Sequence, residues 1–70
     1  DDMAITASVS AGLLKDPDLS ALKIDVDTRN GVVSMYGPAP TAAAKDRATT
    51  IARAVKGVAS VNNELTVKRS

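Results

Sequence analysis

The chain has 70 residues and a formal net charge of +1 at pH 7. A chain of this length is expected to form one domain with a small core, and a charge so close to neutral argues against a strongly electrostatic partner such as duplex DNA. It contains no Cys and no His, and Tyr36 is its only aromatic residue. This composition excludes disulfides, a histidine base, a thiolate nucleophile and an aromatic platform for stacking bases.

Composition leaves the compartment open. No apolar run reaches the roughly 18 residues of a membrane span, and no signal peptide is recognisable. Because the chain begins at Asp1 rather than at an initiator Met, we expect a mature or trimmed fragment. The absence of Cys suits the cytosol and equally the bacterial periplasm.

A first helix is predicted from the Asp1-Asp2 pair, which can cap its start, to Leu14-Lys15. Its apolar residues recur at helical spacing and predict one buried stripe, made of Ile5, Val9 and Leu13 and widened by Ala4, Ala11 and Leu14. The helix ends there because Pro17 disfavours helical geometry at Asp16.

The loop that follows carries two carboxylates, Asp16 and Asp18. We interpret both as solvated turn residues. A cation site is the alternative hypothesis, but a calcium loop of the EF-hand kind needs more oxygen ligands at fixed spacing, and these are missing.

A β-hairpin is the clearest pattern in the chain. Apolar and polar residues alternate from Leu22 to Asp27, which predicts a strand with one buried face. Asn30-Gly31 is a strong hairpin turn signal because both residues accept a positive φ. A second strand follows over Val32–Tyr36, and Gly37-Pro38 is predicted to end it.

A second helix is predicted after Pro40-Thr41, with Thr41 as the cap and Gly57 as the C′ residue. Its buried face comprises Ala44, Ala48, Ile51, Ala52 and Val55. Lys45, Thr49, Arg53 and Lys56 follow one another at i+4 and i+3 steps, which predicts a positive stripe on the outer face, interrupted by Asp46. Arg47 is a further basic residue outside the buried face. Solvation and the helix dipole explain these charges. A weak anionic surface site is the alternative.

The last predicted strand covers Val58–Val67, with a polar tail at Lys68-Arg69-Ser70. Asn63 shares the parity of the buried side chains, so we expect it to bond to nearby backbone rather than to a substrate. Asn62-Asn63 also suggests a bulge. The order α, β, β, α, β predicts a two-layer α+β sandwich, in which a three-stranded mixed sheet carries both helices on one face. We expect a single domain over residues 1–70, with its core from about residue 3 to residue 67.

The whole order resembles the BON domain, a small module first described in bacterial osmotic-shock and nodulation-related proteins. The resemblance runs from about Met3 to Val67. It depends on the hairpin pattern N-G-V-V-x-Φ-x-G at Asn30–Gly37 and on the pattern G-V-x-x-V-x-N-x-L-x-V at Gly57–Val67. Pro38-Ala39-Pro40 departs from the family and stiffens the entry to the second helix.

The resemblance implies a non-catalytic, exported module, periplasmic or at the outer membrane of a bacterium, that binds anionic phospholipid surfaces. It brings no catalytic motif, cofactor or metal. The candidate lipid contacts are the four basic residues of the second helix, although the first helix offers only Lys15. A nucleic-acid module is disfavoured because no GxxG loop is present.

Two alternative functions stay open. A protein-interaction or scaffold module would use a strand edge or the polar face of the sheet, where Val32 and Tyr36 are expected to form a small exposed apolar patch. A cation-sensing domain would use backbone carbonyls, which leave no pattern in the sequence.

Overall fold

The computed structural model describes residues 1–67, so the predicted polar tail lies outside the described residues. The elements follow the predicted order: α1 (Asp2–Lys15), β1 (Asp25–Arg29), β2 (Val32–Ala39), α2 (Ala42–Arg53) and β3 (Ser60–Val67). The strands form one sheet in the order β1-β2-β3, antiparallel between the first two and parallel between the last two. The predicted α+β fold with a mixed sheet is confirmed.

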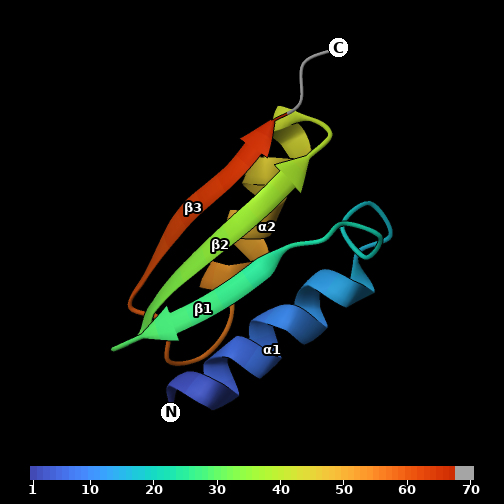
Figure 1. Ribbon diagram of the computed structural model, residues 1–70. Coiled ribbons are helices and arrows are strands. Elements are labelled where there is room, and N and C mark those ends of the chain that lie inside the picture. Colours follow the sequence, from blue (N-terminus) through green and yellow to red (C-terminus); the bar gives the residue numbers. More distant parts are fainter. Residues whose placement is uncertain (68–70) are drawn as a thin grey trace.

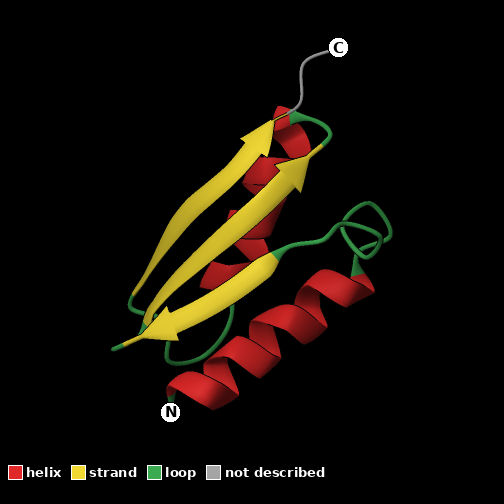
Figure 2. Cartoon of the chain, viewed as in Figure 1, coloured by secondary structure: helices red, strands yellow, loops and turns green. Residues whose placement is uncertain are grey.

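The helices form the second layer of the molecule. α2 lies behind β2 and β3, and α1 runs alongside β1, as Figure 1 shows. The two helices also contact each other (Figure 2). The opposite face of the sheet, called here the outer sheet face, is covered by no element within residues 1–67. Its side chains alternate with those of the core along each strand.

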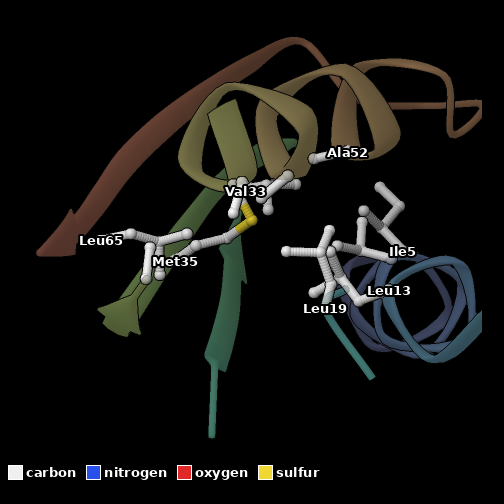
Figure 3. Packing of buried hydrophobic residues seen from close by; sticks show 11 residues of the cluster. Ile5, Leu13, Leu19, Val33, Met35, Ala52 and Leu65 are labelled. Carbon is white, nitrogen blue, oxygen red and sulfur yellow. The ribbon is translucent and has the colours of Figure 1, made fainter. Parts of the chain in front are cut away.

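The core fills the space between the layers. Val33 and Met35 of the central strand are fully buried. In Figure 3 the side chains of Met35 and Leu65 lie close together under α2, while Leu13 and Leu19 pack beside α1. α2 contributes only small buried residues, Ala44, Ala48 and Ala52. Because these side chains fill little space, the helix must lie close to the sheet.

The hairpin turn adopts the predicted geometry. Asn30 has φ 51° and Gly31 has φ 80°, and Arg29 pairs with Val32, which is a two-residue primed turn. The Asp2 carboxylate accepts hydrogen bonds from the backbone N–H of Asn30 at 2.9 Å and of Gly31 at 3.1 Å. The N-terminus of α1 is therefore fastened to the turn, a contact that the sequence did not predict.

The predicted strand boundaries were wrong near Gly37. β1 begins at Asp25 rather than at Leu22, and β2 continues through Pro38 to Ala39. Gly37 has φ 136°, and a Cβ there would collide with the carbonyl oxygen of Lys23, so only glycine lets the incoming chain cross this close. Pro38 is tolerated because it lies beyond the last residue of β2 that pairs with β1.

Two predictions around the second helix were also wrong. α2 ends at Arg53 with Ala54 as its C-cap, so Gly57, at φ 97°, belongs to the following turn and is not the C′ residue. Thr41 does cap the helix, since its side chain accepts a hydrogen bond from the Ala44 N–H. Nor is there a bulge at Asn62-Asn63, because β3 keeps one continuous register with β2 from Ser60 to Val67.

Candidate functional site: the helical face

The four basic residues predicted to bind lipid do not form one patch. Lys45 and Arg47 are separated by about 200° around the helix. The backbone carbonyl of Lys45 accepts a hydrogen bond from Asn63 of β3, whereas Arg47 pairs with Asp16 on the opposite flank. Arg53 is exposed at the end of α2, and Lys56 is exposed in the turn beyond it.

Asp16 is not the solvated turn residue that we predicted. It is only 6% exposed, forms an ion pair with Arg47 and accepts a hydrogen bond from the Asp18 N–H at 2.9 Å. The hydrogen bond from Arg47 lowers the pKa of Asp16, and the same bond raises the pKa of Arg47. Because its charge is already partnered within the protein, Arg47 is a poorer anion ligand than the other three basic residues.

Asn63 fastens α2 to the sheet, as its buried parity predicted. Its Nδ2 donates to the Lys45 carbonyl and to Thr49 Oγ1, both at 2.7 Å, and its Oδ1 accepts from the Leu65 N–H at 3.0 Å. The bonds to the Lys45 carbonyl and the Leu65 N–H confirm the prediction that Asn63 bonds to backbone. With three partners inside the protein, the amide has a structural role.

The outward side of α1 is unexpectedly apolar. Met3 is 85% exposed and Leu14 is 67% exposed. The α1 outer face, defined by Met3, Ala4, Ala7, Ala11 and Leu14, lies opposite the buried stripe of Ile5, Val9 and Leu13. The prediction that Ala4, Ala11 and Leu14 widen the buried stripe was therefore wrong. No charged residue interrupts the helix between Asp2 and Lys15, which is unusual for a helix at the surface of a domain.

The turn that follows α2 lies beside the first half of α1. A Cβ at Gly12 would come within 2.8 Å of the Ile51 side chain, and one at Gly57 would come within 3.3 Å of Ile5. These contacts make the two helices antiparallel neighbours and place Lys56, next to Gly57, near the start of α1. Arg53 lies two positions from Ile51, about 200° around α2, and therefore on the flank of Thr49 that faces away from α1. We call the α1 outer face together with Arg53 and Lys56 the helical face.

Residues 1–67 offer no side-chain metal centre and no membrane-spanning helix. No group of three or more His, Cys, Asp and Glu side chains within residues 1–67 could hold a metal ion. In the same range, no helix is long and apolar enough to cross a membrane. Every buried side-chain nitrogen and oxygen in this part of the chain has a hydrogen-bond partner. The helical face is thus the feature that packing within the domain does not explain.

Comparison with known proteins identifies the family. The model of the BON domain matches residues 1–69. The chain belongs to the BON family. It is 42% identical over 67 residues to osmotically-inducible protein Y of Escherichia coli (strain K12), and 37% identical over 68 residues to outer membrane lipoprotein DolP of Haemophilus influenzae. Each match covers 96% of this chain but 33% and 35% of the relatives, so this BON domain spans about a third of their length.

Proposed function

We propose that this BON domain is a non-catalytic module of the bacterial envelope that binds anionic phospholipid surfaces through its helical face. The observation that carries the proposal is the exposed apolar stripe of Met3, Ala7, Ala11 and Leu14 on α1. A helix with such a stripe can lie in the plane of a bilayer interface, with its apolar side among the head groups.

Exposed basic residues supply the preference for anionic lipid. Lys56 lies next to Gly57 in the turn beside Ile5 of α1, and Arg53 is exposed on the outward side of α2. Near an anionic leaflet each basic residue contributes about 1 kcal/mol. Two such contacts and a short apolar stripe give weak, reversible binding, which a second copy or a neighbouring domain would strengthen through avidity.

The relatives support the envelope as the location. One is named as osmotically inducible and the other as an outer membrane lipoprotein, and neither name is that of an enzyme. The second name agrees with a location at the outer membrane, and the first agrees with a role in the response to osmotic stress.

Co-sedimentation with vesicles tests the proposal. Replacing Arg53 and Lys56 together by Glu should reduce binding to phosphatidylglycerol vesicles by about tenfold or more, because two attractions become repulsions. Phosphatidylcholine vesicles should bind weakly in every case. The matched control, Lys23→Glu with Asn62→Glu and Thr66→Glu, changes the net charge equally at exposed positions outside the helical face and should bind like the wild type. Equal binding by the variant and its control would refute the assignment of this face.

A protein-interaction module is the second candidate, and the outer sheet face favours it. Val32 is 38% exposed and Tyr36 is 47% exposed on this face. Asp25 and Glu64 flank Tyr36 in the strand register, and their negative charges disfavour contact with an anionic membrane. If Tyr36→Ser abolished binding to a protein partner but left vesicle binding unchanged, the result would favour this candidate.

A further inference from the structure

The two edges of the sheet differ in how they are protected. β1 has five residues with charged side chains at Asp25, Asp27 and Arg29, and α1 packs beside it. β3 has eight residues, Ser60–Val67, with Glu64 as their only charge and with no Pro, Gly or bulge. Natural sheets usually protect their edges by such devices. β3 lacks them, and no element within residues 1–67 pairs with its open edge.

Backbone groups on the open edge can accept another strand. The Leu65 N–H donates to the Asn63 side chain rather than to β2. Successive residues of a strand direct their backbone groups to opposite sides, so the N–H and C=O groups of Val61, Asn63 and Val67 point the same way as those of Leu65. Apart from the Leu65 N–H, these outward groups form no internal ladder in the described part of the chain.

We propose that β3 pairs antiparallel with β3 of a second copy of this chain, around a two-fold axis at Asn63. The two sheets would then become one sheet of six strands. This register pairs Ser60 with Thr66 and Asn62 with Glu64 of the second copy. It keeps both side-chain faces aligned, and the Leu65 N–H exchanges the Asn63 side chain for the Val61 carbonyl of the second copy.

The charges on β3 select this register among its neighbours. Moving the axis to Glu64 would place two carboxylates directly opposite each other, which destabilises a strand pair. Moving it to Asn62 would leave more of the strand unpaired. A second copy fits better than an unrelated strand because both edges carry the same unpaired backbone groups and the same low charge. One symmetric contact therefore pairs the open backbone groups of both copies.

This contact leaves the α1 outer face free. α1 packs beside β1, whereas the pairing edge belongs to β3 at the other side of the sheet. Lys45 and Thr49 of α2 lie over β3, where Asn63 bonds to both of them. The two Lys45 side chains would therefore approach each other in the pair. All variants should therefore be compared at one moderate salt concentration, because salt that screens this repulsion also screens the charge pairs that test the register.

Charge substitutions at Asn62 and Glu64 test the register. Both residues are exposed, so the variants should fold. Asn62→Lys creates two new pairs with Glu64 and should raise the dimer association constant by about three- to tenfold, and Asn62→Asp should lower it by a similar factor. Adding Glu64→Lys to Asn62→Asp should restore it. Thr50→Lys, an equal charge change on the exposed side of α2, should leave it unchanged.

Sedimentation equilibrium of the 70-residue chain measures these constants, and amide exchange locates the contact. Exchange at Val61 and Asn63 should slow as the protein concentration rises, while exchange along β1 should not. A chain that stays monomeric at millimolar concentration would overturn the proposal. So would a dimer whose association constant is the same in the Asn62 variants, or one in which only the exchange along β1 responds to concentration.

Discussion

The two helices occupy the same layer but differ on their outward sides. α2 has a buried stripe of three alanines and an outward side of charged and hydroxyl residues. α1 has a buried stripe of Ile5, Val9 and Leu13, yet its outward side is apolar as well. Solvation alone explains the outer face of α2, but it does not explain the α1 outer face. The difference shows that a helix can satisfy the core with one side and remain available for a contact with the other.

The largest expected effect on stability comes from comparing two adjacent residues that lie on opposite sides of α1. Leu13 is 5% exposed and Leu14 is 67% exposed. Leu13→Ala should lower the free energy of unfolding by about 2–5 kcal/mol because it leaves a cavity in the core. Leu14→Ala should change it by no more than about 0.5 kcal/mol. Urea denaturation measures both, and equal costs would mean that the outward side of α1 also stabilises the fold.

The second effect concerns the hydrogen bonds that tie α2 to β3. Asn63→Ala removes three hydrogen bonds and leaves the Leu65 N–H without its partner. We expect a loss of about 2–3 kcal/mol in the free energy of unfolding. The neighbouring change Asn62→Ala, at an exposed position, is the control and should cost less than about 0.5 kcal/mol. A small loss at Asn63 would show that packing alone holds α2 on the sheet.

The corresponding tie of α1 is weaker because it is more exposed to solvent. Asp2 accepts two hydrogen bonds from the backbone of the hairpin turn. Asp2→Ala should cost about 1–2 kcal/mol, and Asp2→Asn, which keeps one acceptor oxygen, should cost less. If thermal unfolding shows the two variants to be equally destabilised, the contribution of Asp2 comes from its charge near the start of α1 rather than from the bonds to the turn.

These contrasts also show what the sequence could predict. The hairpin could be predicted from local residues, because Asn30 and Gly31 readily adopt the positive φ that the turn requires. Spacing was sufficient for the buried stripe of α1. It failed for Leu14, because apolar character does not say which side of a helix a residue occupies. The prediction of the strand boundaries failed at Gly37, because this glycine is required by the close approach of the Lys23 backbone, which lies elsewhere in the sequence.

The candidate site was less predictable than the fold. Four basic residues were chosen on or just after one helix, but only Lys56 lies beside α1, and the role of Arg53 and Lys56 in lipid binding stays a prediction. Arg47 could not be excluded from sequence, because its partner Asp16 is 31 residues away. The sequence did contain one usable signal, the absence of charge between Asp2 and Lys15. An exposed helix normally carries charges on its outward side.

The smallest expected effect appears only at low pH, and it tests the link between the two helices. Asp16 is the C-cap of α1 and forms its ion pair with Arg47 of α2. The hydrogen bond from Arg47 holds the pKa of Asp16 below its ordinary value of 3.8. A carboxyl whose pKa is lower in the folded state binds its proton more readily when unfolded. Its stabilising contribution is therefore complete above the ordinary pKa and is lost as the pH falls through the lowered folded value.

Asp16→Asn should remove this part of the acid dependence. The wild type should lose stability between neutral pH and the acid range more steeply than the variant, and the two curves should converge at the lowest pH. Asp18→Asn is the matched control, because it removes one negative charge from an exposed side chain in the same loop. Urea denaturation at a series of pH values measures all three proteins. Parallel curves for the wild type and Asp16→Asn would show that the ion pair between the helices does not couple folding to the protonation of Asp16.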